Sequence, residues 1–301
     1  MRKRLVDSRD KPSKHHNMVP LLLLALLPVL VTTAPARRHM IDMTHALIDN
    51  GKMPSYPGHT PYNFTINVRG PYKLLNNVNV ELNTILLSEH TATHIDAPSH
   101  VGGKSRVHQI PDQDLIGPGV VIDISEKAKM DKDAELLLED VLKYEETYGR
   151  IPNRAFVFCN SGWEKYWMDK KAFLGTDQWN IVSELHSPGF SLEATKWLVE
   201  QRYIIGIGTD TVSFEKTHTK TLPVHRYLLG EKNRVGFEMV ANLSRVPPAG
   251  ATVYAFPMKI YDGSGAPVRM FAILNGGFGL VASRLTASLM SIMVLYWFYL
   301  F

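Results

Sequence analysis

The chain has 301 residues, of which 45% are hydrophobic and 21% charged, so it is long enough for one large domain or two small ones. Its net charge of +4 does not indicate a nucleic-acid-binding protein, because residues 1–17 contain six basic and two acidic residues and the rest of the chain is therefore neutral. The single cysteine, Cys159, excludes an internal disulfide; it lies in an apolar run, and we expect a buried, unreactive thiol.

The N-terminal segment has the pattern of a secretory signal. Residues 18–31 are almost entirely apolar, follow a basic stretch and precede small residues at 32–36 that suit cleavage. A buried helix is the alternative, but Pro20 and Pro28 would interrupt it. We therefore predict a signal-peptide region over residues 1–36 and delivery of the chain to the secretory pathway, at the extracellular face of a membrane or as a secreted protein.

The first part of the expected domain is rich in turns. Prolines and glycines at residues 53–59 predict a fixed loop rather than a helix. Asn63 lies in an Asn-x-Thr sequon and is predicted to be glycosylated, whereas the sequon at Asn242 lies in a segment that we expect to be buried. Residues 78–87 then predict a strand that leads into a histidine-rich segment.

Residues 88–100 contain three histidines and an aspartate. These are His90, His94, Asp96 and His100. Imidazole and carboxylate groups are the ligands of hydrolytic zinc and manganese sites. An extended strand would spread the four residues over roughly 33 Å, and a helix would turn Asp96 away from His90 and His94. We therefore expect the segment to leave a strand and curl around an ion; the alternative is a set of ordinary core or surface histidines.

Apolar runs and helical stripes alternate in the middle of the chain. Strands are predicted at 120–124, 155–159 and 204–207, and helices at 133–148 and 191–202, the latter with Ser191 as its N-cap. This alternation predicts a parallel βαβαβ unit. Late strands are expected at 253–258 and 271–274. We find no internal repeat and no second domain, so residues 37–275 are predicted to form a single domain.

Two later residues are further candidates for metal ligands. Glu238 is flanked by apolar residues, and a buried acid needs a partner. That partner is either a metal or an arginine such as Arg269. His225 follows a proline and a valine, and an ordinary core or surface histidine is an equal alternative there.

The C-terminal tail carries no charge from residue 285 to residue 301. A hydrophobic tail after a short spacer fits a GPI-attachment signal, with residues 275–277 or Ser283 as the attachment site. A short tail anchor is the alternative. Either form predicts that residues 276–301 tether the folded domain to a membrane.

The segment H-T-A-T-H-I-D-A-P-S-H at residues 90–100 resembles the H-T-x-T-H-x-D-x-P-x-H signature of the metal-dependent cyclase superfamily, which includes bacterial-type kynurenine formamidase and isatin hydrolase. Shorter similar pieces occur in the family's order at 42–45, 57–58, 161–163, 208–211, 223–226, 238–243 and 265–269. The resemblance implies a single-domain α/β protein with the mixed-sheet swivelling β/α fold of cyclases.

The resemblance also implies roles for individual residues. His90, His94 and Asp96 correspond to the ligands of a first metal, and Asp96, His225 and Glu238 to those of a second metal where members carry two. His100 corresponds to the general acid/base. Tyr56 stands where formamidases tend to carry a tryptophan against the substrate ring, which is a departure from the family. The implied cofactor is zinc or manganese, as one or two ions.

The implied activity is hydrolysis of the C–N bond of an amide, formamide or cyclic amide by metal-bound hydroxide. His100 would pass a proton to the leaving group. The expected partners are a small amide or lactam substrate and further copies of the chain in a homodimer or homotetramer. A surface-tethered binding protein that has lost turnover is the alternative, which the complete set of ligands disfavours.

Overall fold

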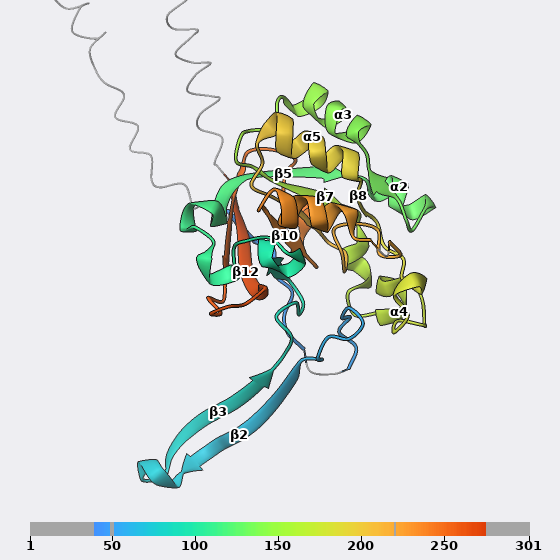
Figure 1. Ribbon diagram of the computed structural model, residues 1–301. Coiled ribbons are helices and arrows are strands. Elements are labelled where there is room, and N and C mark those ends of the chain that lie inside the picture. Colours follow the sequence, from blue (N-terminus) through green and yellow to red (C-terminus); the bar gives the residue numbers. More distant parts are fainter. Residues whose placement is uncertain (1–38, 49–50, 220, 275–301) are drawn as a thin grey trace, which may run out of the picture. The chain divides into compact units, whose positions relative to one another are not determined.

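The computed structural model describes residues 39–48, 51–219 and 221–274 (Figure 1). The chain divides into two units, Met1–Arg37 and Arg38–Phe301, and all the described residues belong to the second. The predicted signal region and C-terminal tail lie outside the described residues. No helix in the described part of the chain has the length and apolar character to cross a membrane.

The core of the fold is a mixed eight-stranded sheet in the order β1-β12-β11-β5-β7-β9-β10-β4. Its strands are β1 (Met40–Asp42), β4 (His94–Asp96), β5 (Ile116–Asp123), β7 (Phe156–Asn160), β9 (Gly206–Thr209), β10 (Val235–Glu238), β11 (Ala251–Pro257) and β12 (Gly265–Leu274). β4 pairs with β10 on one side and with β12 on the other, so the sheet closes on itself. The predicted mixed α/β class is confirmed.

The predicted parallel unit is present at the centre of this sheet, where β5, β7, β9 and β10 run parallel. Successive side chains of a strand point to opposite faces. Val157 and Cys159 pack on the face that is covered by the helices, whereas Phe156 and Phe158 belong to the core on the opposite face. Cys159 is buried, as predicted, and burial raises the pKa of its thiol.

The main helices that cover the sheet are α3 (Leu138–Tyr148) and α5 (Leu192–Arg202) (Figure 1). Ser191 Oγ accepts a hydrogen bond from Ala194 N at 3.2 Å, so the predicted N-cap is confirmed. The helix predicted from residue 133 begins only at Leu138. The preceding residues instead form β6 (Glu135–Leu136), which pairs with β8 (Gly189–Phe190).

Short helical segments complete the fold. They are η1 (Lys73–Leu75), η2 (Pro98–Val101), η3 (Val107–Gln109), η4 (Asp112–Leu115), α2 (Ser125–Met130), η5 (Trp163–Tyr166), α4 (Lys170–Leu174), η6 (Val182–Glu184), α6 (Pro223–His225), η7 (Arg226–Glu231) and η8 (Leu243–Arg245).

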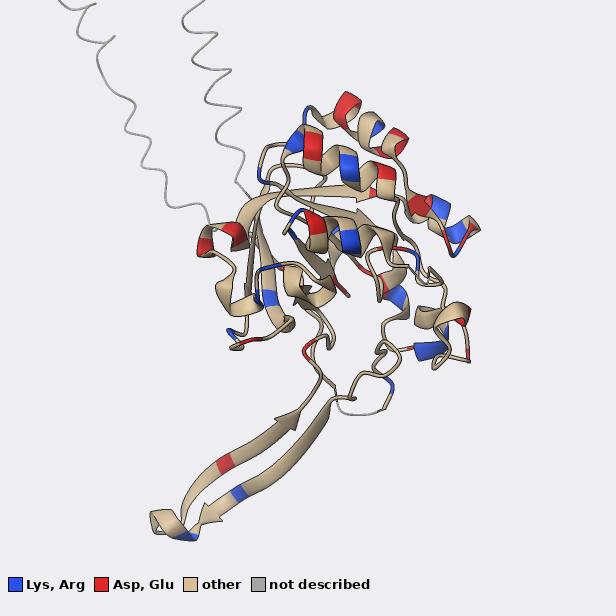
Figure 2. Ribbon diagram, viewed as in Figure 1, with Lys and Arg blue, Asp and Glu red and all other residues tan. Residues whose placement is uncertain are grey.

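A β-hairpin forms a separate two-stranded sheet from β2 (Asn63–Tyr72) and β3 (Val78–Leu86). The strand predicted at 78–87 is therefore present, but within the described residues it pairs with β2 alone. Charged residues are sparse along this hairpin (Figure 2), and several apolar side chains are exposed on it. Those more than 45% exposed on the two strands are Ile66, Val78, Leu82, Ile85 and Leu86.

Candidate metal centre

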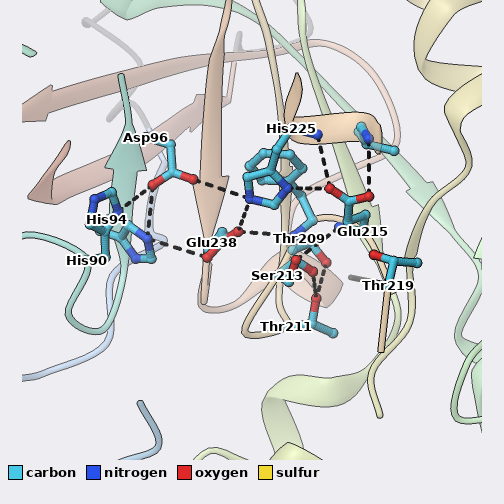
Figure 3. Close-up of polar contacts among 12 residues, drawn as sticks. His90, His94, Asp96, Thr209, Thr211, Ser213, Glu215, Thr219, His225 and Glu238 are labelled. Atoms are coloured by element: carbon cyan, nitrogen blue, oxygen red, sulfur yellow. Dashed lines mark hydrogen bonds and ion pairs between the residues drawn. The ribbon is translucent and has the colours of Figure 1, made fainter. Parts of the chain in front are cut away.

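Four candidate ligands converge at the end of β4 from three parts of the chain (Figure 3). His94 and Asp96 have the same parity on the short strand β4, so both side chains leave it on one face. Glu238, the last residue of β10, is the register partner of His94 in the antiparallel β10–β4 pair. His225 ends the one-turn helix α6. All four residues are buried.

The four side chains form a closed ring of contacts. His94 Nε2 lies 3.3 Å from Asp96 Oδ1 and 3.5 Å from Glu238 Oε2. His225 Nε2 lies 3.2 Å from Glu238 Oε1 and 3.7 Å from Asp96 Oδ2. Ligands bound tetrahedrally at about 2.0–2.2 Å stand roughly 3.3–3.6 Å apart. Each contact of the ring joins an imidazole nitrogen to a carboxylate oxygen at about the spacing of neighbouring ligands on a divalent metal ion.

Unsatisfied polar atoms support this fit. His94 Nε2 and Asp96 Oδ2 are buried and, within the described residues, have no hydrogen-bond partner. A buried polar atom without a partner costs about 1–3 kcal/mol. Both atoms face the ring, so a cation there would satisfy them.

His90 and His100 lie beside the ring. His90 Nδ1 is 2.6 Å from Asp96 Oδ1, and its Nε2 is 3.1 Å from Ser264 Oγ. The His90 and His100 rings have centroids 4.1 Å apart. Ligand atoms of His90, His94 and Asp96 lie within 4.8 Å of one another, and so do those of Asp96, His100 and His225. The structure thus brings together all six residues that the signature and the later motifs predicted.

The arginine alternative for Glu238 is wrong. Arg269 pairs with Asp42, with Nη2 2.6 Å from Oδ2. Glu238 has His94 and His225 as its ion-pair partners instead.

Glu215 is a functional candidate that the sequence analysis missed. Its buried carboxylate accepts hydrogen bonds from Val224 N at 3.1 Å and His225 N at 3.0 Å, and it contacts His225 Nδ1 at 2.5 Å. Phe214 stacks on the other side of the same imidazole, with ring centroids 3.7 Å apart. A single glutamate with no repeated spacing gives no sequence signal of this role. A carboxylate on the outer nitrogen fixes the tautomer and orientation of a metal-binding histidine.

Strained backbone positions accompany the ligands. Ala92, Leu222 and Met239 have φ of 53°, 46° and 51°. These values lie in the left-handed region, which residues other than glycine rarely adopt. Each lies within three residues of His94, His225 or Glu238. Strain of this kind costs on the order of 1–3 kcal/mol per residue and persists where the surroundings fix the geometry.

A cavity of about 210 Å³ opens over the ring. Tyr56 and His59 line it together with His90, His100 and three apolar residues, which are Val212, Leu222 and Met239. The predicted substrate residue Tyr56 thus lies at the site, and so does His59, which the sequence analysis did not single out.

Burial and neighbouring charges set the protonation of these groups. Burial lowers the pKa of His100; the Asp96 carboxylate opposes this effect, and the charges of His90 and His225 reinforce it. Burial would also lower the pKa of His225, but the Glu215 and Glu238 carboxylates outweigh it and raise this pKa to about 10. Asp96 is buried too, yet His90 and His100 hold its pKa well below the ordinary value.

Comparison with known proteins identifies the family. The family described as "Putative cyclase" matches residues 41–216. Isatin hydrolase of Roseibium aggregatum is 32% identical over 201 residues, which cover 64% of this chain and 74% of that protein. Kynurenine formamidase of Salinibacter ruber is 28% identical over 193 residues, which cover 63% and 78%.

Solved structures agree. Isatin hydrolase A from Labrenzia aggregata, bound to benzyl benzoate, matches with a TM-score of 0.71 and 31% identity over 84% of this chain and 99% of its own. An isatin hydrolase bound to the product analogue thioisatinate matches with a TM-score of 0.71 and 27% identity over 79% and 92%. The signature at residues 90–100, the closed mixed sheet and these matches agree: the chain belongs to the cyclase family.

Proposed function

We propose that the protein is a metal-dependent hydrolase that cleaves the C–N bond of an amide, formamide or cyclic amide. The observation that carries this proposal is the ring of two imidazoles and two carboxylates beneath a cavity that His100 also lines. Similar proteins named isatin hydrolase and kynurenine formamidase support the same reaction class.

The side chains of the ring and His90 would hold zinc or manganese as one or two ions. His90, His94 and Asp96 would be the ligands of the first ion, and Asp96, His225 and Glu238 those of a second. A divalent metal in such a site supplies an ionised water at neutral pH and polarises a carbonyl group. The chain's contribution is to fix the four ligands of the ring, because β4 is clamped on both sides and Glu215 holds the outer nitrogen of His225.

His100 would act as the general acid/base. It lines the cavity, its ring lies 6.1 Å from that of His225, and its lowered pKa leaves it free to accept a proton. The proton would then pass to the leaving nitrogen. Val212, Leu222 and Met239 form an apolar wall that suits an aryl group, and Tyr56 would contact the substrate ring from the rim.

The test is hydrolysis of a panel of N-formyl anilines, isatin-like lactams and simple esters by the metal-loaded protein. We expect turnover of at least one C–N substrate, and His100→Ala should lower kcat by about 10²–10⁴-fold while the protein keeps its metal. Unchanged turnover in metal-loaded His100→Ala would refute the role of His100.

A surface-tethered binding protein is the second candidate, and the departure at Tyr56 is the observation in its favour. Metal analysis and the substrate panel together distinguish the hydrolase from the binding protein. A protein that binds metal and a lactam but turns over no member of the panel would support the binding protein.

We also propose that the chain is secreted and tethered to the outer face of a membrane through its C-terminal tail. The apolar segments at 18–31 and 285–301 support this. Release of the protein from intact cells by a phosphatidylinositol-specific phospholipase would support a GPI anchor, and retention would support a tail helix.

We propose in addition that the protein is a homo-oligomer, a dimer or a tetramer. The exposed apolar side chains of the β2–β3 hairpin support it, because a patch of this kind marks an interaction site. Charged substitutions at Ile66 and Leu82 should reduce the mass measured by light scattering to that of one chain. An unchanged mass would contradict this use of the hairpin.

A further inference from the structure

A second cluster of metal-ligating side chains lies outside the catalytic centre. It comprises Asp133, His186 and His218. His186 Nδ1 is 2.7 Å from Asp133 Oδ2, and His218 Nδ1 is 3.4 Å from Asp133 Oδ1. The two imidazole rings have centroids 5.9 Å apart. One ligand atom from each residue lies within 4.8 Å of the other two, so the three share the space around one point.

The position of His218 is not explained by the ion pair between His186 and Asp133. Its Nδ1 is buried and, within the described residues, forms no hydrogen bond, although it faces Asp133. His186 already pairs with that carboxylate. The 3.4 Å separation matches the distance of about 3.3–3.6 Å between two ligands of one tetrahedral zinc ion. The side chains remain 24–37% exposed, so an ion can reach them from solvent.

The three residues come from separate segments that are packed closely. Gly189, after His186, donates its N–H to Ala134 O, next to Asp133, at 3.1 Å. A Cβ at Gly189 would overlap the backbone of Glu215, so this segment lies directly against the loop that carries His218. The cluster therefore has a built frame: its position does not depend on long, freely rotating side chains.

We propose that Asp133, His186 and His218 bind a second transition-metal ion of the zinc class, at a site distinct from the catalytic centre. Two imidazoles and one carboxylate, with water in the fourth position, suit zinc and its neighbours better than magnesium or calcium. The ion would attach the loop of residues 212–219 to the body of the domain. That loop places Ser213 in the catalytic cavity and Glu215 on His225.

The test counts bound zinc in the full chain. Chelator-treated protein is refilled with zinc, passed through a desalting column and analysed by elemental mass spectrometry, in parallel with the His186→Gln/His218→Gln variant. The double variant should retain one zinc fewer per chain than the wild type. The exposed His39 provides the matched control, and His39→Gln should retain the wild-type number.

Two further readouts keep the result decisive. Circular dichroism in chelator shows whether the double variant is folded, and Asp133→Asn, which keeps both histidines, should weaken zinc binding at least tenfold. Cobalt loading should give visible absorption bands in the wild type that are smaller in the double variant. Equal zinc content and equal cobalt bands in the wild type and the folded double variant would overturn the proposal. Because these variants leave the catalytic ligands intact, failure of the proposed hydrolase activity would not alter this difference.

Discussion

Replacing Glu215 with glutamine should weaken metal binding at the catalytic centre without touching a ligand. The carboxylate contacts His225 Nδ1 at 2.5 Å and accepts two backbone N–H groups, from Val224 and His225. A glutamine has a single acceptor oxygen in place of two. Its NH₂ group would therefore face either the imidazole or a backbone donor, and one buried donor would lose its partner.

The size of the effect follows from these contacts. Loss of a partner that orients a metal-binding histidine typically costs 10–100-fold in metal affinity, or about 1.4–2.7 kcal/mol. Separately, the unpaired buried donor should lower the free energy of unfolding by about 1–3 kcal/mol. Both effects should appear in Glu215→Gln, because the residue is 1% exposed and no water can replace the lost acceptor.

The assay is competition of the protein with a fluorescent zinc chelator, together with chemical denaturation of the metal-free protein. Glu200→Gln is the matched control, because Glu200 lies on α5 with a half-exposed side chain. Turnover of Glu215→Gln should recover in part at saturating metal. If the zinc affinity of Glu215→Gln equals that of Glu200→Gln, the inference that Glu215 holds His225 in its ligating orientation is incorrect.

Three further predictions follow from the described contacts. Because the pKa of His225 is raised to about 10, this residue should be protonated at pH 7 in the metal-free protein, and metal binding should release at least one proton. Calorimetry in buffers of different ionisation enthalpy measures the number of protons released. The Arg202 guanidinium is the chief cause of the lowered pKa of Glu145, so this carboxylate should stabilise the fold above its ordinary pKa of 4.5 and lose the effect as the pH falls through the lowered value. In urea titrations, Glu145→Gln should therefore lower the free energy of unfolding by about 1–2 kcal/mol at pH 7 and by much less near pH 3. Gly236→Ala should cost about 1–3 kcal/mol in the same titration and weaken zinc binding, because a Cβ there would overlap the Phe214 ring that stacks on His225.

The ligand set could be predicted from the sequence because most of it lies in one short motif. A single strand over residues 88–100 would be too long to bring the four ligands to one ion, and a helix would turn Asp96 away from the two histidines, so neither could span the whole segment. The structure resolves this with a three-residue strand: β4 uses period two to align His94 with Asp96, and the chain turns before and after it. Glu215 and His59 were not predictable, because each is a single polar residue whose role depends on contacts made by distant segments.

The fold was predictable where its signals were long. The parallel unit of β5, β7 and β9 was expected from apolar runs that alternate with helical stripes, as buried parallel strands require. β10 was missed because four residues are too short to show a period. The hairpin partner β2 was missed because asparagine, glycine and proline interrupt its apolar residues, and these residue types are depleted in strands.

The charge balance of the centre gives a reason why this fold should hold a cation. Asp96, Glu215 and Glu238 are three buried acids, and the ion pairs described for them are all with histidines. Buried carboxylates need positive charge nearby. Without metal that charge must come from protons on His94 and His225, whose pKa values are both raised against the effect of burial. A divalent ion would replace those protons and would also satisfy the unpaired atoms of His94 and Asp96. The metal-free protein should therefore lose stability as the pH rises through the pKa of His225, because the proton that balances the carboxylates is then lost. The metal-loaded protein should not lose stability over this range.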